Sequence, residues 1–182
     1  LCRGKYRDIR RPVLLNSWEA CYFGFDSERL ISIGDACADL GIELMVIDDG
    51  WFGKRDNDRC SLGDWFVNEK KLPGGLKRVS DHLAARGVKL GIWFEPEMIS
   101  PDSELYRAHP DWCLHYVNRP RSEGRFQLIL DLTRADVCDY IYESVASVLR
   151  EGGISYVKWD FNRNMTEAGS PMLPPERMRE VG

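Results

Sequence analysis

Acidic, amide and aromatic side chains gather in four short segments of this 182-residue sequence, each of which begins with an apolar, β-branched run typical of a buried strand. Side chains of these types bind sugar hydroxyls, stack on the apolar face of a sugar ring, or carry acid, base and nucleophilic chemistry. The segments contain Asn16 and Trp18; Asp48, Asp49 and Trp51; Trp93, Glu95 and Glu97; and Lys158, Asp160 and Asn162.

Asp160, in the segment ISYVKWDFN, is a candidate nucleophile. Side chains two positions apart on a strand share a face, so Lys158, Asp160 and Asn162 are predicted to point the same way. An ammonium beside a carboxylate favours its ionised form, which a nucleophile needs. The alternative is that Lys158 and Asp160 only neutralise each other at the rim of a sheet.

Asp48 and Asp49 are neighbours, so only one faces a pocket unless the strand has already ended. They are therefore not a matched acid/base pair, and binding two hydroxyls of a polyol is the preferred interpretation. The alternatives are an acidic loop start or a metal site. We expect no metal, because the three histidines, His82, His109 and His115, show no ligand spacing with acidic residues.

Three tryptophans admit two interpretations. Trp51, Trp65 and Trp93 pack in a core or serve as stacking platforms for a sugar ring.

Three charged residues near the predicted strands also have two possible roles each. Arg125, three residues before LILDL, is a surface residue or a ligand for hydroxyls or carboxylates. Glu95 and Glu97 share a face with Trp93, and each is an acid/base candidate or a structural hydrogen-bond acceptor.

The elements that must position these residues alternate between strand and helix. Strands are predicted over residues 13–18, 43–51, 89–97, 128–132 and 154–162. Helices are predicted from a cap at Asp26 or Ser27 to Leu40, and over residues 76–85, 102–109 and 135–150, the last capped by Thr133. The polar excursion over residues 53–75 is long for such a connection, and we expect it to overhang the site.

This alternation predicts an α/β fold with a parallel sheet, either open and doubly wound or part of a (β/α)8 TIM barrel. The segment after the first strand, NSWEACYFGFD, contains neither G-x-G-x-x-G nor a P-loop, which weakens the nucleotide-binding alternative. The polar residues also follow the strands, where barrel enzymes keep their sites. The barrel is therefore favoured.

Composition excludes several classes of protein. With 43% hydrophobic and 30% charged residues and a net charge of -4, the chain is typical of a soluble globular protein and lacks the basic field that nucleic acid requires. No apolar run approaches the roughly 20 residues that span a bilayer, so no membrane partner is expected. Six cysteines without a C-x-x-C pair favour free thiols and a cytoplasmic location.

Six ordered motifs across residues 13–164 resemble the α-galactosidases of glycoside hydrolase family 36: NSWEACYF, IDDGWFG, LGDWFVNEKKLPGGL, GIWFEPEM, GRFQLILDLT and YVKWDFNR. The resemblance implies a (β/α)8 barrel without a cofactor and a double displacement with Asp160 as nucleophile. It implies that Asp48 and Asp49 bind galactosyl hydroxyls, that Lys158 and Asn162 flank the nucleophile, and that Trp93 and Arg125 line the pocket. Phe126 departs from the polar residue typical of the family.

The resemblance also predicts the organisation of the chain. Residues 1–12 are expected to end a preceding segment and residues 13–182 to form roughly the N-terminal half of the barrel. The family's general acid/base aspartate is expected beyond residue 182, and a longer N-terminus is expected because the first residue is Leu1. Without that aspartate, and with the open sheet edges and uncovered apolar interior of a half barrel, the isolated 182 residues are expected to be inactive and poorly soluble.

Substrate and assembly are expectations of the same kind. The resemblance implies a parent enzyme that hydrolyses α-galactosides of the melibiose and raffinose type and that forms homo-oligomers. The alternatives are a galactosyl-transferring relative of the raffinose-synthase type, an N-acetylgalactosaminidase, and a non-catalytic sugar-binding remnant.

Overall fold

Four parallel strands form the central sheet of the computed structural model, which describes residue 4 and residues 7–166 and 168–177. The strands are β1 (Leu14–Asn16), β2 (Leu44–Ile47), β3 (Lys89–Phe94) and β6 (Tyr156–Trp159), in the order β1-β2-β3-β6. Every neighbouring pair is parallel, so the carboxyl ends of all four strands lie at one edge of the sheet. This confirms the predicted α/β class with a parallel sheet.

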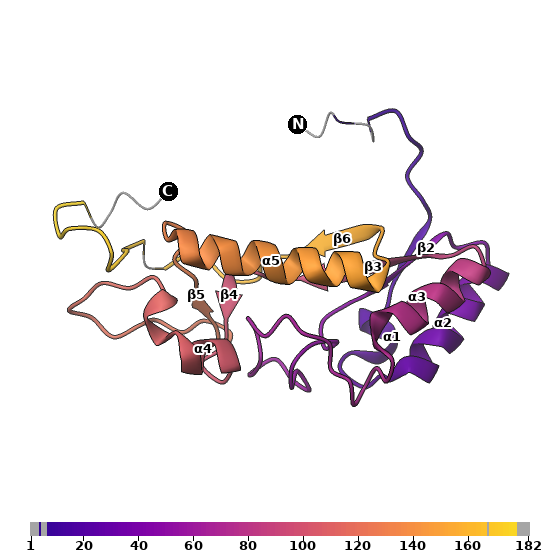
Figure 1. Cartoon of the computed structure of the whole chain (residues 1–182), viewed down its shortest axis with the longest axis horizontal. Helices are drawn as coiled ribbons and strands as arrows, with labels where there is room; N and C mark the ends of the chain where they lie inside the picture. The colour runs from indigo at the N-terminus through magenta and orange to yellow at the C-terminus, as the bar shows by residue number, and fades with distance from the viewer. Residues whose placement is uncertain (1–3, 5–6, 167, 178–182) are drawn as a thin grey trace.

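Helices connect the strands. They are α1 (Trp18–Cys21), α2 (Ser27–Asp39), α3 (Gly75–Ala85) and α5 (Ala135–Gly152). Figure 1 shows α2 and α3 side by side at one end of the molecule, with α5 running along β3 and β6. The contact between α2 and α3 is close, because a Cβ atom added to Gly34 would lie only 2.0 Å from Cδ2 of Leu83.

Two helix starts test the predicted caps. Asp26 caps α2, since its carboxylate accepts a hydrogen bond from the backbone N–H of Arg29 at 2.8 Å. The predicted cap by Thr133 on α5 is wrong. Arg134 holds the cap position without a side-chain bond to the helix, and the Thr133 hydroxyl donates to Asp131 at 2.6 Å instead. The carboxylate two residues earlier competes with the helix for that hydroxyl.

The connection between β3 and α5 contains a second, two-stranded sheet. In it β4 (Met98–Ile99) pairs antiparallel with β5 (Leu128–Ile129), and α4 (Glu104–Ala108) and the 3-10 helix η1 (Pro110–Trp112) lie between them. The sequence predicted a strand at 128–132 in series with the parallel strands, and that placement is wrong. Its partner β4 is only two residues long and begins directly after the predicted strand 89–97, of which β3 covers only Lys89–Phe94.

The core follows from the burial of the central strands. All four residues of β2 are buried, as are the last five of β3. At the two edges of the sheet, Leu14 of β1 and Trp159 of β6 stay 40% and 53% exposed. No described helix is long and apolar enough to cross a membrane. The boundary predicted at residue 13 stays a prediction.

Candidate active site

A pocket of about 330 Å³ opens at the carboxyl edge of the sheet. All seven predicted site residues line it, which are Asp48, Asp49, Trp93, Arg125, Lys158, Asp160 and Asn162. Trp18, Phe23 and Asp58 complete the lining. Asp58 lies in the excursion over residues 53–75, so the expectation that this segment reaches the site is confirmed.

Asp160 follows the last residue of β6 and carries three hydrogen bonds. Its Oδ2 accepts from the indole N–H of Trp93 at 2.9 Å and from the amide of Asn162 at 2.8 Å. Its Oδ1 accepts from the backbone N–H of Phe161 at 3.1 Å. Burial raises the pKa of Asp160, but the bonds from Trp93 and Asn162 and the charge of Lys158 outweigh burial and lower it below the usual value. The carboxylate is therefore held ionised and oriented.

Lys158 does not form its ion pair with Asp160. Its ammonium contacts Oδ2 of Asp48 at 2.8 Å, and the same oxygen accepts from the Asn16 amide at 2.6 Å. Mutual neutralisation of Lys158 and Asp160 is therefore wrong, and the charge of Lys158 reaches Asp160 only through space. The buried carboxylate of Asp48 joins β1, β2 and β6 at the floor of the pocket.

Asp49 is held by Arg55, a residue that sequence reasoning missed. The guanidinium, which is 2% exposed, donates to the Asp49 carboxylate from Nε at 2.9 Å and from its terminal nitrogen at 2.7 Å. Burial raises the pKa of Asp49, and the Arg55 charge opposes that rise. Because β2 ends at Ile47, both aspartates face the pocket, which strand alternation alone excludes.

Lys71 fixes the loop that carries Arg55. Its ammonium donates to the backbone carbonyls of Phe23, Gly50 and Arg55 at 3.0, 3.1 and 2.9 Å, and it forms an ion pair with Asp56 at 2.8 Å. Three separate stretches of chain therefore converge on one cation. Nothing local in the sequence signals this role. Lys70 and Lys71 are adjacent lysines in the same polar loop, yet Lys70 is exposed and only Lys71 holds the loop.

The tryptophans divide between core and site. Trp51 and Trp65 pack with Phe52 and Phe94 in an aromatic cluster, which confirms the core interpretation for these two. Trp93 belongs to the same cluster, yet it also lines the pocket, where its N–H holds Asp160. The geometry makes Trp93 a hydrogen-bond donor to the candidate nucleophile.

Glu95 and Glu97 take structural roles. Glu95 is 1% exposed and accepts hydrogen bonds from the backbone N–H of Asn162 at 2.6 Å and from the amide of Gln127 at 3.3 Å. Glu97 accepts from the indole N–H of Trp159 at 2.8 Å. Neither lines the pocket, so of the two interpretations the structural one holds. Glu95 positions Asn162, which in turn holds Asp160.

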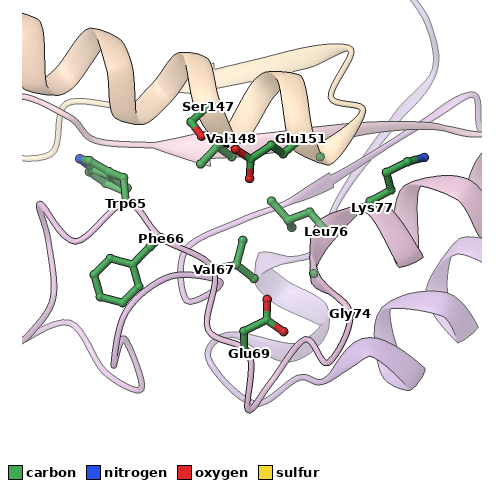
Figure 2. Close-up of a pocket in the computed structure, with 12 residues that line it drawn as sticks. Trp65, Phe66, Val67, Glu69, Gly74, Leu76, Lys77, Ser147, Val148 and Glu151 are labelled. Carbon is green, nitrogen blue, oxygen red and sulfur yellow. Dashed lines mark hydrogen bonds between the residues drawn. The ribbon is translucent and has the colours of Figure 1, made fainter.

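A larger hollow of about 430 Å³ lies between the loop 65–75 and helices α3 and α5 (Figure 2). Leu76 of α3 and Val148 of α5 line it from opposite sides, while Lys77 points away. Its carboxylates, Glu69 and Glu151, are exposed, whereas the smaller pocket holds the buried, paired carboxylates of Asp48 and Asp49. Perturbed buried groups mark functional sites, so we assign the site to the smaller pocket.

No group of three His, Cys, Asp or Glu side chains is arranged to hold a metal ion within the part of the chain that the structure describes. The geometry therefore assigns no residue to a metal.

Comparison with known proteins identifies the family of the chain. The Melibiase family model matches residues 1–182. The chain is 61% identical over 181 residues to alpha-galactosidase AgaA of Geobacillus stearothermophilus and 45% identical over 181 residues to alpha-galactosidase Mel36A of Lactobacillus acidophilus. Each alignment covers 100% of this chain and 25% of the relative, so the chain spans about a quarter of the length of these relatives.

Solved structures agree with the sequence matches. A variant of the GH36 alpha-galactosidase AgaA in complex with raffinose superimposes with a TM-score of 0.95 at 60% identity, covering 98% of this chain and 25% of that one. A second variant of AgaA, in complex with stachyose, also gives a TM-score of 0.95. These matches confirm the predicted partial (β/α)8 barrel. The chain belongs to the melibiase family, and its fold is a segment of a GH36 alpha-galactosidase catalytic barrel.

Proposed function

We propose that this chain supplies the nucleophile and the galactose-binding wall of a retaining α-galactosidase that cleaves raffinose-type oligosaccharides. The observation that carries the proposal is Asp160, ionised and oriented by Trp93 and Asn162 inside a pocket where Asp48 and Asp49 are already paired with Lys158 and Arg55. Support for the substrate class comes from the relatives, since AgaA variants bind raffinose and stachyose.

The chemistry of the proposal is a double displacement. The Asp160 carboxylate attacks the anomeric carbon, the bond from that carbon to the leaving oxygen breaks, and a second carboxyl group gives the leaving oxygen a proton. Water then hydrolyses the galactosyl ester with the second group as base, so the configuration is retained. Asp48 and Asp49 are not assigned as the acid, because their carboxylate oxygens are already held by Lys158 and Arg55.

Those two aspartates have a different part in the proposal. Paired carboxylates at the floor of a pocket keep their remaining lone pairs for the hydroxyl groups of a sugar. Asp48 is shared by Asn16 and Lys158, and Asp49 by Arg55, so both acceptors are fixed before substrate arrives. Fixed acceptors reduce the ordering cost of binding.

Azide rescue tests the nucleophile. In the polypeptide that the encoding gene specifies, Asp160→Gly should abolish hydrolysis of an aryl α-galactoside, and added azide should restore turnover with the β-galactosyl azide as product. Azide attacks from the face that the carboxylate leaves empty, so the anomeric configuration inverts. An Asp160→Gly variant with an unchanged hydrolysis rate would overturn the assignment.

The same preparation separates the rival functions. A galactosyl-transferring enzyme would make a longer oligosaccharide from raffinose instead of free galactose, and a sugar-binding remnant would bind galactose in calorimetry without turnover.

We also propose a cytoplasmic location, supported by the free thiols of Cys21, Cys37, Cys60, Cys113 and Cys138. Fractionation of cells with an antibody to the polypeptide tests it.

A further inference from the structure

A strained two-residue turn stands beside the pocket. Gly124 and Gln127 exchange two backbone hydrogen bonds, at 3.2 and 3.0 Å, and Arg125 and Phe126 form the turn between them with φ of 55° and 60°. Such turns are usually made by Asn-Gly or similar pairs, because other residues are strained at positive φ. Strain of this kind persists where the side chains are needed in that place.

The two strained residues present different side chains. Arg125 lines the pocket, whereas the ring of Phe126 is 42% exposed. The turn is anchored from behind by the buried guanidinium of Arg163, which donates to the carbonyls of Ser122 and Gln127. The exposure of Phe126 is therefore not the result of a loose segment, because the backbone that carries it is held from the protein interior.

Phe126 contacts the excursion that reaches the pocket from the other side. The guanidinium of Arg59 lies over the Phe126 ring, 4.5 Å from its centroid. Asp58, the preceding residue, lines the pocket. The contact therefore joins two segments at the rim, next to the residues that line the pocket wall.

The polar groups of this rim are open to a ligand. Among the residues that the structure describes, the Arg59 guanidinium has no hydrogen bond or ion pair, and the Asp58 carboxylate has none either. A guanidinium offers five N–H donors and a carboxylate offers several acceptor sites. An exposed aromatic face beside free donors and acceptors is the combination that binds a pyranose ring.

We propose that Asp58, Arg59 and Phe126 form a subsite for the sugar attached to the galactosyl unit, which is the leaving group of the reaction. This inference rests on the proposed function and adds to it the residues that select the leaving group. The leaving sugar would stack on the exposed part of the Phe126 ring and exchange hydrogen bonds with Asp58 and Arg59. The strained turn is retained because it places this ring at the rim.

The test compares two substrates that share the galactosyl unit. Raffinose carries a large sugar leaving group, whereas α-galactosyl fluoride has a leaving group without a ring. In the polypeptide that the gene encodes, Phe126→Asn should lower the ratio of kcat/KM for raffinose to kcat/KM for the fluoride by about tenfold, the lower end of discrimination by apolar contacts. Asn also tolerates positive φ, so the melting temperature should not fall.

Matched variants make the result decisive. Phe126→Tyr keeps the ring and should keep the ratio, and Arg59→Gln should lower it as Phe126→Asn does. Tyr142→Asn removes an exposed ring from α5 that does not line the pocket, and should change kcat/KM for neither substrate. An unchanged ratio in both Phe126→Asn and Arg59→Gln would overturn the subsite. If the unaltered polypeptide turns over neither substrate, the proposed function itself fails.

Discussion

Trp93 gives Asp160 one of its three N–H donors, so Trp93→Phe removes a single hydrogen bond while keeping an aromatic ring in the core. The lost bond runs from the indole nitrogen to Oδ2 at 2.9 Å. The bonds from Asn162 and from the backbone of Phe161 remain. A phenyl ring at position 93 still packs beside Phe52, whose ring stacks on Trp93 with centroids 6.2 Å apart.

The magnitude follows from the charge on the acceptor. A hydrogen bond to a charged group contributes about 1.5–3 kcal/mol, and the lower end applies because Asp160 is half-buried at an open pocket. Since one pKa unit corresponds to about 1.4 kcal/mol, loss of the bond should raise the pKa of Asp160 by about one unit. The nucleophile must be ionised, so the acid limb of kcat/KM should move to higher pH by about one unit.

Steady-state kinetics across the acid range measures this limb for the unaltered polypeptide and for Trp93→Phe. Trp51→Phe is the matched control, because Trp51 lies in the same aromatic cluster and its N–H donates to the backbone carbonyl of Trp93 at 2.9 Å rather than to Asp160. The control should lose stability without moving the limb. An acid limb that stays in place in Trp93→Phe, or that moves equally in both variants, refutes the reasoning.

Three further changes test the packing and charges described above. Arg55→Met leaves Asp49 buried without its partner and should destabilise the fold by about 3–5 kcal/mol. That loss should shrink as the pH falls through the raised pKa of Asp49, which thermal melts at about pH 5 and about pH 8 compare. Gly34→Ala brings a Cβ into Leu83 and should cost about 1–3 kcal/mol, and in denaturant titrations the double variant with Leu83→Ala should lose less than the sum of the two single losses. Lys158→Met removes the cation at the pocket floor. It should lower kcat/KM at least about tenfold, since a hydrogen bond to a charged group contributes about 1.5–3 kcal/mol. An unchanged kcat/KM would argue against a role of Lys158 in substrate binding.

The order of strands and helices could be predicted because apolar runs and caps are local signals. The ends of the strands could not. The segments 43–51 and 154–162 were predicted as strands throughout, yet β2 ends at Ile47 and β6 at Trp159. The polar residues that follow leave the sheet to face the pocket, so a period of two residues no longer says which way Asp160 points.

The residues that line the pocket could be predicted, but their hydrogen-bond and ion-pair partners could not. Six of the seven predicted residues come together because they lie at the carboxyl ends of parallel strands, whereas Arg125 reaches the pocket from the turn before β5. Lys158 pairs with Asp48, which is 110 residues away in sequence, and not with its neighbour Asp160. Arg55 appears in the sequence as one more charged residue in a polar loop, and only the fold buries it against Asp49.

Chemical labelling of the Lys71 amine reports whether the loop that carries Arg55 is in place. Its three N–H donors point to three backbone carbonyls, its charge is paired with Asp56 and its side chain is only 13% exposed, so an acylating reagent does not reach the nitrogen while the loop stays in place. Lys70, one residue earlier and exposed, carries no such restraint. The ratio of label on these two adjacent side chains, read from a single peptide by mass spectrometry, would therefore report how often the loop that holds Arg55 opens.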